Sequence, residues 1–152
     1  MKLYPDIEPY DIQFLSVGDD HQIYIEQSGN PNGVPVTFLH GGPGAGTSSI
    51  YRRFFDPSIY RIIMFDQRGS GKSTPYGSVN KNTSSYLVED IKTILDTLNI
   101  KKSILYGGSW GSTLALLFSE RYPSYVHSLV LRGIFLCRSD DIKWFYQKGA
   151  DS

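Results

Sequence analysis

A serine stands in a glycine-rich turn between two segments of different type. Residues 107–111 read Gly-Gly-Ser-Trp-Gly, with the run Ser-Ile-Leu-Tyr before them and a helix-favouring run over 112–118 after them. A strand, a sharp turn and a helix around one serine form a nucleophile elbow, whose strained backbone exposes the hydroxyl. Strand and helix crowd so closely there that only glycine fits two residues before and after the serine, where Gly107 and Gly111 stand. We therefore predict that Ser109 is a nucleophile for acyl transfer and has a positive φ.

A second glycine-rich loop supplies a partner for this serine. The apolar run 36–39 ends in His40-Gly41-Gly42-Pro43-Gly44, which resembles the loop that completes the oxyanion hole of α/β-hydrolases. Negative charge develops on a carbonyl oxygen under nucleophilic attack, and losing one fixed N–H donor to that oxygen costs about 3–4 kcal/mol. We assign the two donors to the backbone N–H groups of Gly42 and Trp110, since Pro43 has none.

A third segment, Asp-Gln-Arg-Gly-Ser-Gly-Lys-Ser over 66–73, contains the Gly-Lys-Ser of a phosphate-binding loop. Such a loop also needs a glycine five residues before the Gly-Lys pair, and that position holds Asp66. A carboxylate there would repel phosphate. We therefore expect a turn that leaves a buried strand, with Asp66 and Arg68 in structural roles.

These motifs together make the chain similar to the proline iminopeptidases, also called prolyl aminopeptidases, of the α/β-hydrolase superfamily. The matching segments are 40–44, 66–73, 107–116 and Leu-Arg-Gly-Ile-Phe over 131–135, in the family's order and at family-like spacing. The tryptophan after the serine favours a peptidase, because lipases, esterases and epoxide hydrolases usually carry other residues there. Epoxide hydrolases also place aspartate where this chain has Ser109.

The resemblance implies a cytoplasmic serine exopeptidase that releases N-terminal proline from peptides through an acyl-enzyme, without a metal or cofactor. It also implies an aromatic pocket for the proline ring, with two walls at the positions of Phe135 and Phe145. Relatives often have tyrosine at the second wall, so Phe145 keeps the apolar contact and lacks the hydroxyl. Aromatic residues that follow a strand such as 126–131 also suit core positions, and both interpretations stay open.

The sequence offers no convincing general base, which a serine hydroxyl needs. In this superfamily the order is serine, acid, histidine, yet only His127 follows Ser109, and it falls in the apparent strand 126–131. His40 belongs to the oxyanion loop and His21 to an early strand. The resemblance implies a later cap and two further strands that deliver the acid and the histidine. We therefore expect an N-terminal part of a longer enzyme, inactive alone, with residues 1–135 in the hydrolase core and 136–152 at the start of the cap.

Hydrophobic patterning predicts an α/β fold, an α/β-hydrolase core with a mostly parallel sheet, an N-terminal hairpin and flanking helices, truncated before the cap and last strands. Strands are expected near 11–17, 21–27, 35–39, 61–65, 103–106 and 126–132, and helices near 48–55, 84–98 and 111–121. Asn82 or Thr83 is expected to cap the helix 84–98, and Asp140 and Asp141 to form a solvated turn. The strand 126–131 should have an open edge, which predicts poor solubility of the chain alone.

Charge and composition exclude several partners. Lys plus Arg and Asp plus Glu both number 15, so no electrostatic surface for nucleic acid is expected. The N-terminus lacks a signal peptide's apolar core and no run reaches a membrane span, which predicts a soluble intracellular protein. Two alternatives stay open: another α/β-hydrolase that acts on esters or epoxides, and a non-catalytic fragment that binds a partner, such as the missing half of the enzyme. The oligomeric state is not determined by the sequence.

Overall fold

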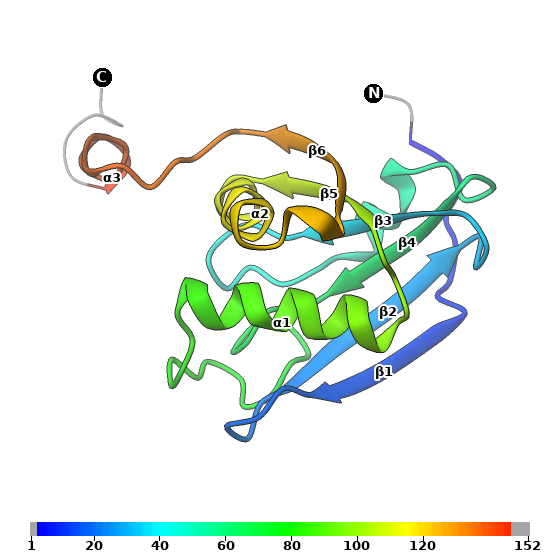
Figure 1. Cartoon of the computed structure of the whole chain (residues 1–152), viewed down its shortest axis with the longest axis horizontal. Helices are drawn as coiled ribbons and strands as arrows, with labels where there is room; N and C mark the ends of the chain where they lie inside the picture. The colour runs from blue at the N-terminus through cyan, green and yellow to red at the C-terminus, as the bar shows by residue number, and fades with distance from the viewer. Residues whose placement is uncertain (1–2, 147–152) are drawn as a thin grey trace.

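The computed structural model describes residues 3–146 of the 152-residue chain. Within that range six strands form one sheet in the order β1-β2-β4-β3-β5-β6 (Figure 1). The strands are β1 Asp11–Ser16, β2 Gln22–Gly29, β3 Val34–Leu39, β4 Tyr60–Phe65, β5 Ser103–Gly108 and β6 Val126–Arg132. The α-helices are α1 Ser84–Thr97, α2 Trp110–Arg121 and α3 Ser139–Tyr146, and two 3₁₀ helices are η1 Ser49–Phe54 and η2 Pro123–Tyr125.

The sheet is mostly parallel behind an N-terminal hairpin, as the sequence predicts. β1 and β2 form the antiparallel hairpin, and β2 then pairs antiparallel with β4. β3 pairs in parallel with both β4 and β5, and β5 pairs in parallel with β6. The carboxyl ends of β3, β4 and β5 therefore meet at one edge of the sheet, which is where open α/β sheets place their sites.

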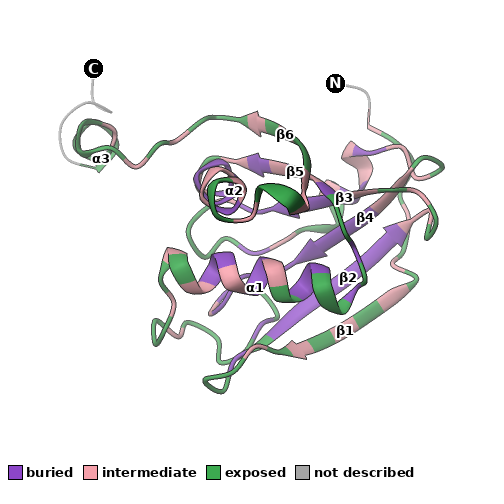
Figure 2. Ribbon diagram, viewed as in Figure 1, coloured by how far each residue is buried: buried purple, intermediate pink, exposed green. Residues whose placement is uncertain are grey.

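The sheet is covered on both faces, because alternate residues of a strand point to opposite sides. On β4, Ile63 and Phe65 belong to the hydrophobic cluster that includes α1 and α2, whereas Ile62 and Met64 belong to a smaller cluster with η1 on the other face. The apolar stripe predicted for the helix 84–98 is buried (Figure 2). Its members in the larger cluster are Leu87, Val88, Ile91, Ile94 and Leu95, with Leu98 just beyond the helix.

The helix expected over 48–55 is the 3₁₀ helix η1. A 3₁₀ helix repeats every three residues, so side chains three apart lie on one side. Tyr51 and Phe54 use this spacing to pack on Phe38 of β3, with ring centroids 4.4 Å and 6.3 Å from the Phe38 ring. Between them, Arg52 reaches Glu26 of β2, and Nε lies 2.7 Å from Oε1. These tertiary contacts, rather than helix propensity, account for the conformation of this segment.

The predicted N-cap position of α1 is confirmed without a capping bond, and the turn predicted at Asp140 and Asp141 was wrong. Thr83 is the N-cap of α1 but makes no side-chain capping bond, and the Asn82 amide instead donates to the carbonyls of Arg68 and Ser78. Asp140 and Asp141 lie in the first turn of α3 rather than in a loop. An acidic first turn is favourable because it faces the positive end of the helix dipole.

The last described helix, α3, lies away from the main body of the fold. Within residues 3–146, β6 is an edge strand that pairs with β5 alone, and α3 follows it at the end of an extended stretch (Figure 1). The boundary expected at residue 135 falls in that stretch and stays a prediction. No helix in the described part of the chain has the length and apolar character needed to cross a membrane.

Candidate active site

Ser109 occupies a strained turn between β5 and α2. It is the N-cap of α2 and has φ 53° and ψ −123°, outside the regions that residues with a side chain favour. Ser109 is exposed to solvent. The positive φ predicted for this serine is confirmed. Strain of this kind costs about 1–3 kcal/mol and is found where the surrounding structure enforces it.

Gly107 and Gly111 are required by close approach of backbone to backbone. A Cβ added at Gly107 would lie 2.2 Å from the carbonyl oxygen of Gly111, and one added at Gly111 would lie 2.1 Å from the carbonyl oxygen of Leu39. Neither neighbour can move without displacing a strand or a helix. The crowding predicted around the turn is therefore present, and it holds Ser109 above the sheet.

The loop after β3 lies directly against this turn. A Cβ at Gly41 would meet the carbonyl oxygen of Gly108 at 3.2 Å and the Cβ of Ser109 at 3.6 Å. Gly42 has φ +120°, which a residue with a side chain rarely adopts. Within residues 3–146 the N–H groups of Gly42 and Trp110 donate no hydrogen bond. Both remain available to an external acceptor.

A cavity of about 360 Å³ opens beside Ser109. Its walls come from β3, the loop after β3, η1, the turn at Ser109 and the end of β6. The lining residues are Phe38, Leu39, Gly41, Gly42, Ala45, Tyr51, Gly108, Ser109, Arg132 and Gly133. The end of β6 also steadies the turn, because the Ser109 N–H donates to the Arg132 carbonyl at 3.1 Å.

None of the three histidines forms a hydrogen bond with the Ser109 hydroxyl within the described residues. His40 is buried, and burial lowers the pKa of its imidazole, so the ring is neutral at pH 7. Its Nε2 accepts from the Gln67 N–H at 3.0 Å, so Nδ1 carries the proton and donates to the Gly41 carbonyl at 2.8 Å. His21 is buried against the Asn80 carbonyl, and His127 is exposed on β6.

Asp66 and Arg68 hold the loops that follow β3 and β4, which agrees with the structural roles expected for them. The Asp66 carboxylate is buried and accepts hydrogen bonds from the N–H groups of Thr47 and Lys72, at 2.6 Å and 2.8 Å. Arg68 forms a buried bidentate pair with Asp90 of α1, at 2.7 Å and 2.8 Å. These contacts leave neither side chain free for substrate.

Phe135 and Phe145 lie near each other, with ring centroids 6.3 Å apart. Phe135 is anchored to α2, since its N–H donates to the Ser112 hydroxyl and its carbonyl accepts from the Thr113 hydroxyl. Phe145 lies on α3 and is 55% exposed. Neither ring is among the described residues that line the cavity beside Ser109. Their role in binding proline stays a prediction.

Gln67 is a site residue for which the sequence predicted no role. Its buried side chain accepts from the Trp110 indole N–H at 3.0 Å and donates to the His40 carbonyl at 2.9 Å. The one signal in the sequence is a polar amide two residues after the buried strand β4, behind Asp66. The position of Gln67 in the sequence does not identify its two partners, which follow β3 and β5.

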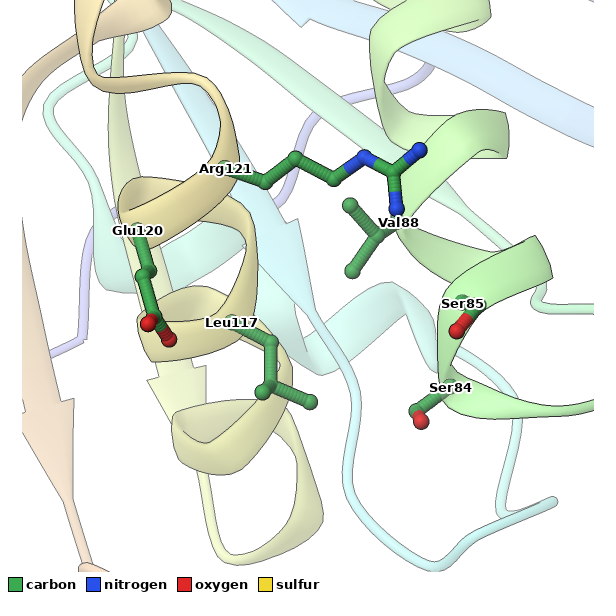
Figure 3. Close-up of a pocket in the computed structure, with 6 residues that line it drawn as sticks. All are labelled: Ser84, Ser85, Val88, Leu117, Glu120 and Arg121. Carbon is green, nitrogen blue, oxygen red and sulfur yellow. The ribbon is translucent and has the colours of Figure 1, made fainter.

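Another cavity, of about 310 Å³, lies between α1 and α2 (Figure 3). Val88 and Leu117 form its apolar floor, and Arg121, which extends toward α1, pairs with Glu89 at 2.7 Å. It shares no lining residue with the cavity beside Ser109. The described residues also contain no group of His, Cys, Asp and Glu side chains arranged to hold a metal ion.

Comparison with known proteins agrees with this geometry. Residues 34–150 match the family model described as alpha/beta hydrolase fold. The chain is 56% identical over 149 residues to a probable proline iminopeptidase of Leptolyngbya boryana, covering 98% of this chain and 46% of that protein. It is 56% identical over 148 residues to a proline iminopeptidase of Arabidopsis thaliana, covering 97% and 39%.

A crystal structure of a proline iminopeptidase-related protein from Thermus thermophilus is also similar, with a TM-score of 0.69 and 29% sequence identity. The match covers 80% of this chain and 43% of that one. The chain thus spans less than half the length of these relatives. The family match extends over most of the sequence and includes both glycine-rich loops, so the chain belongs to the α/β-hydrolase fold family.

Proposed function

We propose that this chain carries the nucleophile and oxyanion hole of a serine exopeptidase that releases N-terminal proline from peptides. The observation that carries the proposal is the exposed Ser109 at φ 53°, with the Gly41-Gly42 loop against it. The 56% identity to proteins named proline iminopeptidases supports proline as the released residue.

In the first step the Ser109 Oγ attacks the carbonyl carbon of the N-terminal residue. A bond forms between Oγ and that carbon, and the C=O electron pair moves onto oxygen. The N–H groups of Gly42 and Trp110 would stabilise this oxyanion, aided by the positive end of the α2 dipole. The C–N bond then breaks, the leaving amine takes the serine's proton through a base, and water later hydrolyses the ester.

The base is the part of this mechanism that residues 3–146 do not supply. His40 is neutral but already bonded at both ring nitrogens, and His21 and His127 have other neighbours. A serine hydroxyl without a base is a weak nucleophile near neutral pH. We therefore expect the 152-residue polypeptide alone to be inactive toward prolyl amides.

The proline ring would contact Phe135 and Phe145, which present apolar rings on neighbouring segments. Because Phe145 carries no hydroxyl, recognition there would be by shape and apolar contact rather than by a hydrogen bond. This favours the compact pyrrolidine ring over a charged side chain.

The test combines a mass measurement with three substrates. The protein is purified from its native source, its intact mass is determined, and release of a chromophore is followed from a prolyl amide, an alanyl amide and a short ester. Selective turnover of the prolyl amide by a species larger than 17.1 kDa would support the proposal. Turnover of the ester alone would indicate another hydrolase, and a 17.1 kDa species active on the prolyl amide would refute the inactivity of the short chain.

A further inference from the structure

Gln67 sits where the two halves of the proposed oxyanion hole approach each other. It follows β4, whereas His40 and Gly42 follow β3 and Trp110 follows β5. The residue is 2% exposed, so its amide has no alternative partner in bulk water. Its backbone N–H and both ends of its side-chain amide are engaged with these two loops.

The side-chain amide joins the loops directly. Its Oε1 accepts the Trp110 indole N–H at 3.0 Å, and its Nε2 donates to the His40 carbonyl at 2.9 Å. An amide with one acceptor and one donor in use has a fixed orientation, because a flip would place like groups together at both ends. The distance between the two loops is therefore set by one rigid group.

The backbone N–H of Gln67 acts on the same loop through the His40 ring. It donates to His40 Nε2 at 3.0 Å and so leaves the proton on Nδ1, which donates to the Gly41 carbonyl at 2.8 Å. The Gly41 C=O and the Gly42 N–H belong to one planar peptide unit, which is not among the chain's cis bonds. Holding that oxygen therefore fixes the direction of the Gly42 N–H.

We infer that the Gln67 side chain positions both oxyanion donors, Trp110 through the bond from its indole to Oε1 and Gly42 through the bond from Nε2 to the His40 carbonyl, which holds the same loop as the backbone bond to the His40 ring. This inference rests on the proposed function, since it assigns those N–H groups to an oxyanion. Gln67 itself touches neither the serine nor the reacting atoms. Chains of hydrogen bonds polarise their members, so the contact at the Gly41 oxygen also strengthens the Gly42 N–H as a donor.

The first test needs no activity. In ¹⁵N-labelled protein, Gln67→Met removes both side-chain bonds with little change of volume. It should accelerate exchange of the Trp110 indole proton about tenfold, the effect of losing one net hydrogen bond, and shift the Gly42 amide resonance. Gln67→Glu keeps an acceptor for Trp110 but no donor for His40, so it should shift Gly42 while the Trp110 indole stays protected.

The matched control is Gln13→Met on the edge strand β1, where the amide donates to Asp11. It should leave both resonances in place, and Trp144→Phe assigns the second indole. A Gly42 amide that keeps its wild-type resonance in both folded Gln67 variants would overturn the inference. Circular dichroism identifies any variant that does not fold. If one Gln67 variant does not fold, the Gly42 resonance of the other variant tests the inference.

The second test is kinetic and uses wild type and Gln67→Met purified from the native source, as in the test of the proposed function. Gln67→Met should displace the oxyanion donors by a fraction of an ångström and so lower kcat by about 10–100-fold. Its KM should stay within about twofold of the wild-type value, because the ground-state carbonyl binds weakly in the oxyanion hole. A kcat equal to that of Gln13→Met would overturn the positioning role. Absence of turnover in the wild type would refute the proposed function instead, while the resonance test would still decide whether Gln67 aligns the two N–H groups.

Discussion

Ser109 combines exposure with an unfavourable backbone conformation. Its φ of 53° and ψ of −123° suit glycine, yet the residue carries a side chain that lies beside a cavity of about 360 Å³. The surrounding contacts, among them the bond from its N–H to the Arg132 carbonyl, enforce the turn. A strained serine at this place is consistent with a chemical role and has no evident benefit for stability.

The strained backbone of Ser109 predicts that glycine is more stable than alanine at this position. Ser109→Gly should raise the free energy of unfolding relative to Ser109→Ala by about 1 kcal/mol, because alanine keeps the Cβ that opposes a positive φ. Urea unfolding of the two variants measures the difference. Equal stabilities, or a more stable alanine variant, would mean that the turn is not strained in solution.

The burial of His40 predicts that the free energy of unfolding depends on pH. Burial lowers the pKa of its imidazole below the ordinary 6.5, so the folded protein binds fewer protons than the unfolded chain as the pH falls through 6.5. The free energy of unfolding should therefore decrease on acidification below that pH, by up to about 1.4 kcal/mol per pH unit from this group. Urea unfolding between about pH 5 and pH 7.5 measures the slope.

The control for this prediction is His40→Gln, which cannot titrate and keeps an amide near the Gly41 carbonyl. Its slope should be smaller over the same pH range, since the other two histidines are unchanged. An identical slope in both proteins would exclude His40 as the source.

At the scale of elements, the contact of β3, β5 and α2 depends on glycine. A Cβ at Gly111 would lie 2.1 Å from the Leu39 carbonyl oxygen, so Gly111→Ala must push α2 away from the sheet. We expect a loss of about 3 kcal/mol or more in the free energy of unfolding, the range of severe core overpacking.

Gly18→Ala is the matched comparison, since Gly18 has φ +82° but no atom within 4 Å of an added Cβ. It should cost only the backbone strain, about 1 kcal/mol. Thermal or urea unfolding distinguishes the two effects. Similar losses in both variants would contradict the close helix–sheet contact.

The elements themselves were largely predictable, and the physical reason is periodicity. The α1 stripe with Ile91 and Leu95 repeats at helical spacing, and the apolar run 62–65 suits a strand buried on both faces. The 3₁₀ form of η1 was not predictable, because its conformation follows from Phe38 and Glu26, which lie on other strands. The N-cap of α1 is Thr83, as predicted, but its side chain makes no capping bond, and Asn82 instead donates to the Arg68 carbonyl.

At the site, the glycine-rich loops and the positive φ at Ser109 could be predicted from local sequence because they follow from backbone geometry. The role of Gln67 could not. It depends on side chains that meet from the ends of three different strands, and only the strand order β4-β3-β5 brings these ends together.

At the scale of the whole molecule, β6 has a free edge within the described residues. Val130 on this strand is 45% exposed, and exposed apolar edge strands template aggregation. We expect Val130→Lys to increase the soluble fraction of the expressed chain, because edge lysines oppose strand addition.

Val79→Lys serves as the control, since Val79 is 88% exposed but lies in a loop. Centrifugation and light scattering measure the soluble fraction and the particle size. An equal improvement in both variants would indicate a general charge effect, and a soluble wild-type monomer with a sharp cooperative melt would contradict the role of the edge.

In the proposed mechanism the Ser109 hydroxyl attacks the carbonyl carbon of a prolyl amide. The most direct measurement is the turnover of a prolyl amide by wild type and by Ser109→Ala, both purified from the native source with intact masses determined. We predict turnover in the wild type and a loss of about 10⁴-fold or more in the variant, the scale of removing an activated nucleophile. Prolyl amide turnover that survives in folded Ser109→Ala would contradict the claim.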